Sequence, residues 1–550
     1  MLPFSRTPRL AAAAAALALA LTACSGGGTG DTADSAGQPV AGGALTWGIE
    51  TEPITFNPHQ YAQAKARLLV WNSFEALLTH DADGGFVPWL ATGYQVSPDG
   101  LVYTVKLRTD VTFHDGEKFD AAAVKANFDQ LLQPGYAPAL RGVQLRNLGS
   151  VTVTVTDPAT VTITLTAPDV LILDFLASPQ GAQISPKSLR EAKNLKAGGP
   201  DVVGTGPFVL DRYTPGQEVH YRKYPAYHWA PANAGHQGAA YLDEVTYRFL
   251  KESSVRVGAL TSGQVQVIEG VPATDQDLVK TTPQLALNKS LNSGSAYSYY
   301  FNTGHAPFDD VRVRRAFRDA VDVDAVLQAV YRGTATRAWS VIGPTSPLYD
   351  KRFEGSYGNN AANADKLLDE AGWSGRDAEG FRTRDGKRLT VRVVQSAPYV
   401  RDRRDILAQA VQAAVKQSAG IDLKVSIVDQ GTATAAIAAN EFEIFDNSRA
   451  DTDAGAALNL LLFSTGAINR TNYKDPELDG LLAAGQATGD PAKRVSVYSD
   501  IQRLTVADQA LLLPLYAPAD QIGAARTIGG IGFEPTAGVP GSAYNIWIGK

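Results

Sequence analysis

The most regular pattern of hydrophobic and polar positions lies between residues 89 and 128. Apolar residues occupy alternate positions in two runs, 94–96 and 103–107, and Ser, Pro, Asp and Gly separate the runs at 97–100. Alternation on both sides of a turn-forming segment predicts a β-hairpin. Apolar residues then recur at helical spacing behind Asp120, a residue type that caps helix N-termini, so we expect a helix to follow.

More short strands are expected around this hairpin. A third strand is predicted at 111–113, and two strand-rich runs, 151–155 and 161–165, are separated by a turn at Asp157-Pro158-Ala159. Together with the hairpin they predict a small, mostly antiparallel subdomain. Before it, apolar residues at 68–78 repeat at helical spacing and are expected in the core.

The second half of the chain has a different order of elements. A strand at 389–394, a helix at 406–418 and a strand at 423–428 form a βαβ-like unit, which predicts a parallel strand pair. Other helices begin behind aspartates, which cap helix N-termini well. The aspartates expected to cap helices are Asp309 or Asp310, Asp322, Asp475 and Asp490, the last two followed by proline.

Several motifs occur in a fixed order along the chain. They are Pro88-Trp89-Leu90-Ala91, Asp99-Gly100, Leu107-Arg108, Phe113-His114-Asp115-Gly116, Gly204-Thr205-Gly206-Pro207-Phe208, and Pro307-Phe308 followed by Val311-Arg312-Val313-Arg314. As an ordered set they resemble the motifs of the peptide/nickel-type (family 5) extracytoplasmic solute-binding proteins of ABC transporters. The resemblance covers most of residues 43–550. It implies an α/β, two-lobed, periplasmic-binding-protein-like (type II) fold with an additional small mixed α+β subdomain.

The chain is therefore expected to divide into several segments. These are a signal peptide (1–23), a lipidated cysteine with a flexible tether (24–42), a discontinuous lobe 1 (43–80, 198–290 and 515–550), the small subdomain (81–197) and lobe 2 (291–514).

The N-terminus predicts export. Arg6 and Arg9 precede an apolar run of twelve residues, 10–21, which spans only about 18 Å as a helix and is too short for a membrane core of about 30 Å. Leu21-Thr22-Ala23-Cys24 resembles a bacterial lipobox, which implies a lipid-anchored protein on the extracytoplasmic face of the cell membrane. The alternative is an ordinary signal peptide that contains a cysteine. Residues 25–42 contain few large apolar side chains that could form a core, as expected of a flexible tether.

Composition excludes some partners. The 550 residues carry a formal net charge of −6, and this sign argues against nucleic acid or anionic lipid as the main partner. Cys24 is the only cysteine, so an intrachain disulfide and a cysteine-rich metal site are both excluded. His220, His228 and His236 are spaced eight apart, which fits no metal-ligand motif, and neither a metal nor a cofactor is expected.

The best candidate for ligand contact is the segment 442–453. The resemblance places here a strand and a loop with an aspartate that grips the ligand's ammonium group in peptide binders, and Asp451 matches that position. The alternative is that Asp451 or Asp453 caps the following helix, and for Asp453 the cap is the preferred interpretation. Ser448 stands where a tryptophan is usual, and no arginine lies just upstream. Arg449 is a candidate carboxylate clamp, although a solvated arginine is the simpler interpretation.

Five more residues fall on loops or strand ends near the cleft that the resemblance implies. We expect about half of them to line it; they are Tyr61, Gln63, Tyr297, Trp339 and Tyr516.

Enzyme motifs are missing from the chain. It contains no nucleophile elbow, no S-x-x-K and no H-E-x-x-H, although a pair of carboxylates for glycoside hydrolysis could be assembled from its 56 acidic residues. We therefore expect a monomeric, non-enzymatic receptor of an ABC importer, which closes on a small solute and delivers it to the permease subunits. The expected solute is peptide-like, with an opine, a metal chelate or a sugar as alternatives. A sensor without transport and a secreted hydrolase are the other functional hypotheses.

Overall fold

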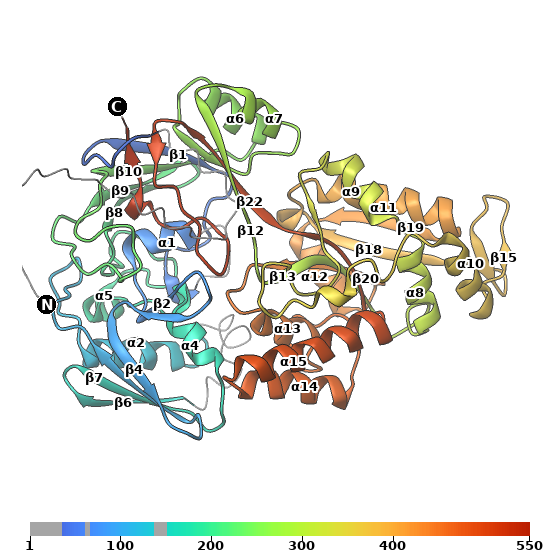
Figure 1. The fold of residues 1–550 in the computed structure, drawn as a ribbon, viewed down its shortest axis with the longest axis horizontal. Coiled ribbons are helices and arrows are strands. Elements are labelled where there is room, and N and C mark those ends of the chain that lie inside the picture. Colours follow the sequence, from blue (N-terminus) through green and yellow to red (C-terminus); the bar gives the residue numbers. More distant parts are fainter. Residues whose placement is uncertain (1–35, 61–66, 137–150, 550) are drawn as a thin grey trace, which may run out of the picture.

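The computed structural model describes residues 36–60, 67–136 and 151–549. Two sheets lie in separate lobes (Figure 1). Lobe 1 contains a seven-stranded sheet with the order β12-β22-β11-β1-β10-β9-β8, and lobe 2 a six-stranded sheet with the order β14-β21-β13-β20-β18-β19. A four-stranded sheet, β4-β5-β7-β6, forms the subdomain beside lobe 1. The predicted two-lobed α/β fold with a small extra subdomain is confirmed.

The strands have the following bounds. The sheet of lobe 1 contains β1 (Ala44–Ile49), β8 (Phe208–Thr214), β9 (Glu218–Lys223), β10 (Glu244–Phe249), β11 (Val267–Glu269), β12 (Leu285–Leu291) and β22 (Ala519–Ala525). The sheet of lobe 2 contains β13 (Ser295–Phe301), β14 (Thr336–Arg337), β18 (Thr390–Ser396), β19 (Asp422–Val428), β20 (Ile444–Arg449) and β21 (Leu512–Ala517). The subdomain contains β4 (Ala91–Val96), β5 (Val102–Leu107), β6 (Thr152–Asp157) and β7 (Thr160–Thr164). Short strands outside these sheets are β2 (Leu78–His80), β3 (Phe86–Pro88), β15 (Gly375–Arg376), β16 (Arg382–Arg384), β17 (Lys387–Arg388), β23 (Ile528–Gly529) and β24 (Trp547–Ile548).

The helices belong to three regions. Those of lobe 1 and the subdomain are α1 (Arg67–Ser73), α2 (Ala121–Leu132), α4 (Leu171–Leu176), α5 (Pro186–Glu191), α6 (Ser253–Thr261) and α7 (Gln276–Thr281). Those of lobe 2 are α8 (Val311–Asp319), α9 (Val323–Tyr331), α10 (Ala361–Glu370), α11 (Arg404–Ala419), α12 (Gln430–Ala438), α13 (Ala454–Leu462), α14 (Pro476–Ala487) and α15 (Pro491–Gln502).

Most local expectations are confirmed. β4 and β5 form the predicted hairpin, with Tyr94 opposite Val105. The Asp120 side chain caps α2 by accepting from the Ala123 N–H, and Asp310 caps α8 in the same way. β18 and β19 pair in parallel, as the βαβ pattern predicted.

Two local predictions were wrong. Residues 111–113 form only an isolated bridge, between Thr112 and Lys118. The helical interpretation of 68–78 fails after Ser73, where α1 ends and the chain becomes extended to pair as β2 with β3. The apolar residues of 74–78 are buried nevertheless. The sequence pattern therefore predicted their burial correctly and their helical conformation incorrectly.

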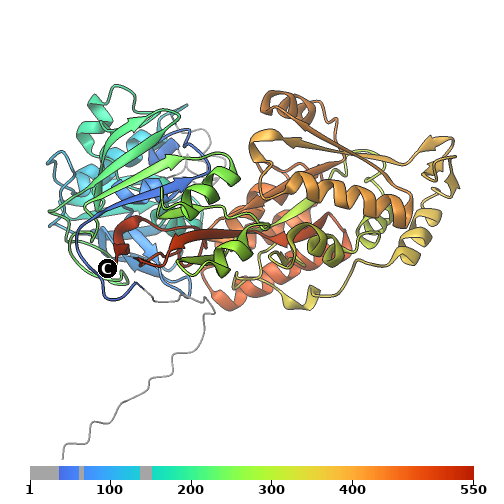
Figure 2. The ribbon, with the colours of Figure 1, turned by 90° about the horizontal axis from the view of Figure 1, so that it is seen from above.

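Both connections between the lobes run along one antiparallel ribbon. In lobe 1, β12 pairs with β22, and Leu291 lies opposite Ala519. In lobe 2 the continuing strands, β13 and β21, pair with each other, and Tyr297 lies opposite Tyr516. Figures 1 and 2 show the two segments passing together from one lobe to the other. The return crossing therefore follows Ala517, the last residue of β21.

The ribbon is interrupted where it passes between the lobes. Asn292 N donates to the carbonyl oxygen of Pro518 at 2.8 Å, and its side chain donates to Asp520 at 3.0 Å. Pro518 has no N–H to continue the ladder. A short two-stranded segment with few ladder bonds is the natural place for the lobes to rotate.

Hydrophobic packing makes lobe 1 and the subdomain one body. A single core joins residues of both sheets, such as Trp47 on β1 and Val105 on β5, with Phe128 on α2. Lobe 2 instead has a core on each face of its sheet. Leu513 belongs to one core and Leu512 to the other, because neighbouring side chains of a strand point to opposite faces.

A buried carboxyl group lies in lobe 1. Glu75 accepts hydrogen bonds from Tyr227 (2.5 Å), Thr205 and Trp229 (2.8 Å each) and Trp89 (3.1 Å). Burial raises the pKa of Glu75 to about 8, although the four donors lower it. The folded protein therefore keeps a proton at neutral pH that the unfolded chain releases near pH 4.5.

This proton makes stability depend on pH. Because the folded-state pKa is raised, the contribution of Glu75 is complete below about pH 4.5 and is lost as the pH rises through about 8. The free energy of unfolding should fall by up to about 1.4 kcal/mol per pH unit in this window. Urea denaturation of Glu75→Gln should show less stability, since each carboxyl oxygen faces a tryptophan N–H, and should lack this pH dependence. The exposed control Glu441→Gln should keep the wild-type slope; the same slope in Glu75→Gln would contradict the assignment.

Candidate ligand-binding site between the lobes

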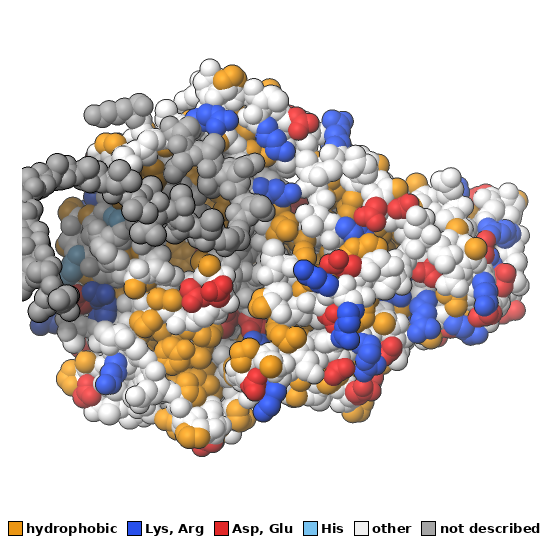
Figure 3. Space-filling model, viewed as in Figure 1, with side chains coloured by type: hydrophobic (Ala, Val, Ile, Leu, Met, Phe, Trp, Pro, Cys, Tyr) orange, Lys and Arg blue, Asp and Glu red, His pale blue; other side chains and the backbone are white. Residues whose placement is uncertain are grey.

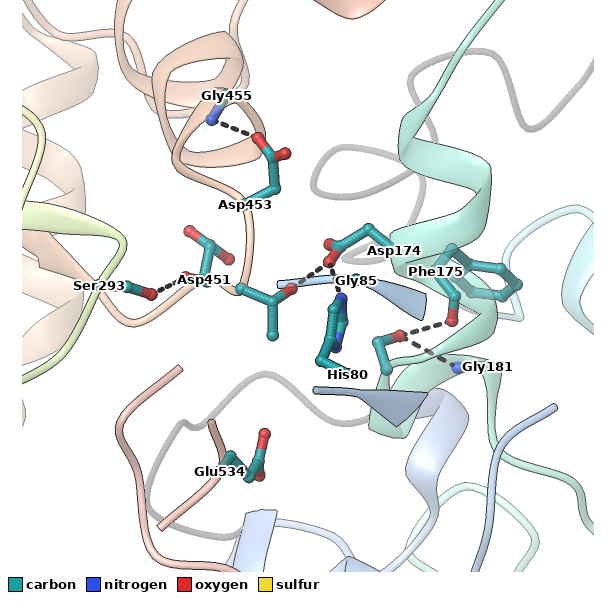
Figure 4. Close-up of polar contacts among 12 residues, drawn as sticks. His80, Gly85, Asp174, Phe175, Gly181, Ser293, Asp451, Asp453, Gly455 and Glu534 are labelled. Carbon is teal, nitrogen blue, oxygen red and sulfur yellow. Dashed lines mark hydrogen bonds and ion pairs between the residues drawn. The ribbon is translucent and has the colours of Figure 1, made fainter. Parts of the chain in front are cut away.

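The loop that follows β20 carries two of the predicted ligand residues. Arg449 Nε donates to Asp451 Oδ2 at 2.6 Å, and Arg449 Nη2 donates to Oδ1 at 3.0 Å. Asp451 is 8% exposed. Asp453 caps α13 by accepting from the Gly455 N–H at 2.6 Å, as expected (Figure 4). Asp451 is held by Arg449 in a two-pronged ion pair.

Lobe 1 and the crossing segment both contact this loop. Arg67 Nη1, at the start of α1, donates to the carbonyl oxygen of Ala450 at 3.3 Å and pairs with Glu534 at 3.5 Å. Burial raises the pKa of Glu534, and Arg67 opposes this shift. Ser293 Oγ donates to the carbonyl oxygen of Asp451 at 3.0 Å (Figure 4). The loop thus lies where the two lobes and the hinge ribbon meet.

Gly294 explains how closely the ribbon approaches this loop. A Cβ atom at this position would lie 2.3 Å from the carbonyl oxygen of Arg449 and 2.6 Å from the backbone nitrogen of Asp451. Real Cβ atoms do not approach this closely, so only glycine allows the contact. Rotation about the ribbon therefore acts directly on the backbone that carries Arg449 and Asp451.

A buried arginine joins two more of the predicted residues. Cζ of Arg404, the first residue of α11, lies 4.1 Å from the centroid of the Tyr297 ring. Arg404 Nε donates to the Tyr516 hydroxyl at 3.1 Å, and Nη2 donates to Ser448 Oγ at 2.8 Å. Arg404 is only 4% exposed, yet within the described chain it forms no ion pair with a carboxylate, although the charge of Asp402 acts on it.

Polar groups continue along the ends of the neighbouring strands. Asp446 on β20 accepts from the Tyr297 hydroxyl at 2.6 Å and from Gln395 Nε2 at 3.0 Å. Gln395 is fully buried, and its Oε1 has no hydrogen-bond partner in the part of the chain that the structure describes. β18 and β20 are parallel, so these groups lie near one edge of the sheet, where ligands bind in open α/β sheets.

A cavity of about 170 Å³ adjoins this cluster between the lobes. Lobe 2 contributes Arg403 and Tyr516, and lobe 1 contributes Glu50 and Gly270, which follow β1 and β11. The carboxyl ends of strands from both sheets therefore face this space. α11 starts at its edge with no side-chain cap, and its N-terminus favours a negative charge.

The sequence-based candidates fall into three groups. Tyr297 and Tyr516 meet through Arg404, and Arg449 and Asp451 pair with each other. Trp339 packs instead against Arg337 and Tyr357 within lobe 2. Tyr61 and Gln63 lie outside the described residues.

Sequence reasoning missed Arg403, Arg404 and Gln395, and it included Asp446 only as part of the candidate segment 442–453. A signal for two of them was present: the basic run 401–404 lies directly before the predicted helix 406–418. Cations at a helix N-terminus oppose the helix dipole, but Asp402 and Asp405 lie in the same segment, so three arginines here are only a partial signal for an anion site.

The lobes also contact each other beside the subdomain. Gln486 at the end of α14 donates to Asp169 at 2.7 Å, and Val170 N donates to the carbonyl oxygen of Gln486 at 3.0 Å. Thr452 donates to Asp174, which lies 3.3 Å from His80 (Figure 4). Burial raises the pKa of Asp169 to about 6, against the lowering effect of the bond from Gln486. The structure therefore has its lobes in contact through polar side chains.

The family follows from comparison with known proteins. A family model described as bacterial extracellular solute-binding proteins, family 5 Middle, matches residues 85–469, which is more than half of the chain. The chain belongs to this family. Its members are solute-binding proteins of ABC importers, which deliver their solutes to permease subunits, and they are not enzymes. The resemblance seen in the sequence is confirmed.

Individual relatives agree with this. The chain is 30% identical to the glutathione-binding protein GsiB of Salmonella paratyphi A over 460 residues, covering 82% of this chain and 84% of GsiB. NikA from Brucella suis in complex with Fe(III)-EDTA superposes with a TM-score of 0.79 at 25% identity, covering 90% of this chain and 98% of NikA. AgaA from Agrobacterium tumefaciens R10 in complex with agropinic acid gives a TM-score of 0.74 at 25% identity, covering 92% and 99%.

The surface and the helices add two observations. On the face shown in Figure 3, acidic and basic side chains are interspersed across lobe 2. No helix within residues 36–60, 67–136 or 151–549 has the length and apolar character needed to cross a bilayer.

The contact between the lobes can be tested by changing its charge. Gln486→Glu would place a second carboxylate against Asp169, and like charges at this distance cost several kcal/mol. At pH 8, where both groups are ionised, small-angle scattering of the ligand-free variant should give a larger radius of gyration than the wild type. At pH 5 the difference should shrink, because one carboxyl then carries a proton. The exposed control Gln430→Glu should match the wild type at both pH values; an unchanged radius for Gln486→Glu at pH 8 would contradict the contact.

Proposed function

We propose that this receptor binds a solute with an anionic group, as a monomer, in the space between the carboxyl ends of the two sheets. The supporting observation is Arg404, a buried guanidinium held by two hydroxyl groups and a tyrosine ring. Asp402 acts on it electrostatically, but no carboxylate of the described chain forms an ion pair with it. Burying a charge without a directly bonded counter-ion is costly, so a ligand carboxylate is the natural partner. Arg403 and the N-terminus of α11 add to the attraction.

The compounds named for the relatives fit this charge. GsiB is a glutathione-binding protein, and the NikA and AgaA structures contain Fe(III)-EDTA and agropinic acid. Each of these compounds carries at least one carboxylate group. The proposed solute class is therefore peptide-like or opine-like acids and carboxylate chelates, with sugars disfavoured.

Closure follows from contacts with both lobes. A solute that reaches Arg404 of lobe 2 and the strand ends of lobe 1 would bind the closed form better than the open form. Only such a difference in affinity can shift the equilibrium between the two forms. The permease would then recognise the closed form.

The anion contact is tested by Arg404→Gln, which removes the charge and keeps a planar hydrogen-bonding group. Losing one partner of a buried charge pair costs about 2–5 kcal/mol, at least a thirtyfold loss of affinity. Calorimetry with whichever of glutathione, agropinic acid and an alanyl-glutamate peptide binds the wild type should show this loss. The exposed Arg190→Gln on the subdomain should bind like the wild type. Equal affinity in Arg404→Gln would place the anion elsewhere.

We propose further that the protein is lipid-anchored at Cys24 on the extracytoplasmic face of the membrane. The lipobox-like sequence 21–24 supports this, and these residues lie outside the described chain. Several acyl chains at about 0.8 kcal/mol per buried CH₂ would hold the protein on the bilayer.

Cys24→Ala should therefore release the protein into an aqueous wash of cells. The wild type should remain with the membrane and carry lipid mass on its N-terminal peptide. Membrane retention of the variant, together with a lipid-free N-terminal peptide in the wild type, would refute the anchor.

A further inference from the structure

The ion pair between Arg449 and Asp451 is built into a rigid part of the fold. Arg449 N donates to Ser295 Oγ at 3.0 Å, and the next two carbonyl groups accept from Arg67 and Ser293. The backbone of Gly294 packs closely against the backbone of Arg449 and Asp451. The loop is therefore fastened at three successive residues, and the two side chains are held opposite each other.

The pair compensates the negative charge of Asp451 from within the protein. Both of its oxygens accept from Arg449, in the parallel two-bond geometry that suits guanidinium and carboxylate groups best. Although burial opposes it, the charge of Asp451 raises the pKa of Arg449. Because Arg449 is part of the same chain, it binds Asp451 without losing freedom of association, whereas a solute ammonium group would lose that freedom on displacing it.

The other carboxylates near the ion pair also have partners within the protein. Glu534 pairs with Arg67, and Asp446 is satisfied by Tyr297 and Gln395. In contrast, Arg403 and Arg404 form no ion pair within the described chain, and Nε of Arg403 has no hydrogen-bond partner there. Of the carboxylates that line the cavity, Glu50 lies 3.9 Å from Arg256 and Asp402 lies 3.8 Å from Arg401. Arg403 also lines the cavity and has no such partner in the described chain.

We infer that Arg449 is the built-in counter-ion of Asp451 and that this receptor selects acids with two or more carboxylates and no free ammonium group. This rests on the proposed function, since it concerns the same acidic solute. Arg449 occupies the place of a ligand ammonium group, so a free amino terminus gains nothing at Asp451 and is desolvated at a cost. Solutes whose nitrogen is acylated avoid that cost, while their carboxylates meet Arg403 and Arg404.

A matched pair of probes tests this selectivity. Alanyl-glutamate and N-acetyl-alanyl-glutamate differ in the ammonium group and share both carboxylates. Wild-type protein should bind the acetylated probe at least tenfold more tightly by titration calorimetry. Arg449→Gln uncovers Asp451 and should reverse the preference by at least tenfold, and Arg449→Lys, which keeps the charge, should retain the wild-type preference.

The double variant Arg449→Gln/Asp451→Asn provides the control for the reversal. It has lost the carboxylate that would attract the ammonium group, so the preference for the free amine should disappear again. Wild-type preference for the free amine, or an unchanged ratio in Arg449→Gln, would overturn the inference. If Arg449→Gln does not fold, the ratio of the two probe affinities in the wild type and in Arg449→Lys still tests the inference. A preference for the free amine in either protein would contradict it.

Failure of this inference differs from failure of the proposed function. If neither probe binds the wild type, the selectivity for acylated dicarboxylates is wrong. The proposed function survives that result when glutathione or agropinic acid binds and Arg404→Gln weakens the binding. It fails when an acidic solute binds and Arg404→Gln leaves the affinity unchanged.

Discussion

The two segments that cross between the lobes form a single antiparallel ribbon, and the geometry of the whole molecule depends on it. The same strands pair as β12 and β22 in one sheet and as β13 and β21 in the other. Between the sheets the ladder is interrupted beside Pro518, so this segment can rotate while each lobe keeps its packed core. Each lobe therefore moves as a body whose strand ends face the other lobe.

The ribbon also connects the hinge to the ligand site. Ser293 and Gly294 touch the backbone of Arg449 and Asp451, and Tyr297 and Tyr516 on the following strands hold Arg404. A change in the angle between the lobes would consequently alter the site without any intermediate element. The hydrogen bond between Gln486 and Asp169 joins the lobes at a second place, beside the subdomain.

Charge is distributed unequally over the site. Its carboxylates are satisfied from within the protein, by Arg449, by Arg67 or by neutral donors such as Tyr297. Arg404 is buried against hydroxyl groups and an aromatic ring at the start of a helix, where the dipole adds to its positive potential. Buried cations of this kind lower the stability of the empty site and are compensated when an anion binds, so the same feature gives affinity and selectivity.

The sequence by itself determined the elements, their order and the family. Alternation at 94–96 and 103–107 predicted the hairpin, and Asp120 and Asp453 predicted two helix caps. The strand–helix–strand pattern at 389–428 predicted a parallel strand pair. All of these features depend on residues that are close in the sequence, so local patterns predict them. Only the tertiary structure decided that Asp451 is paired with Arg449 and that Arg404 lies between Tyr297 and Tyr516. Those contacts join residues up to 112 positions apart or depend on a loop conformation fixed by Ser293 and Gly294. Sequence periodicity records which face of an element is buried, and it carries no information about which distant polar group meets it there.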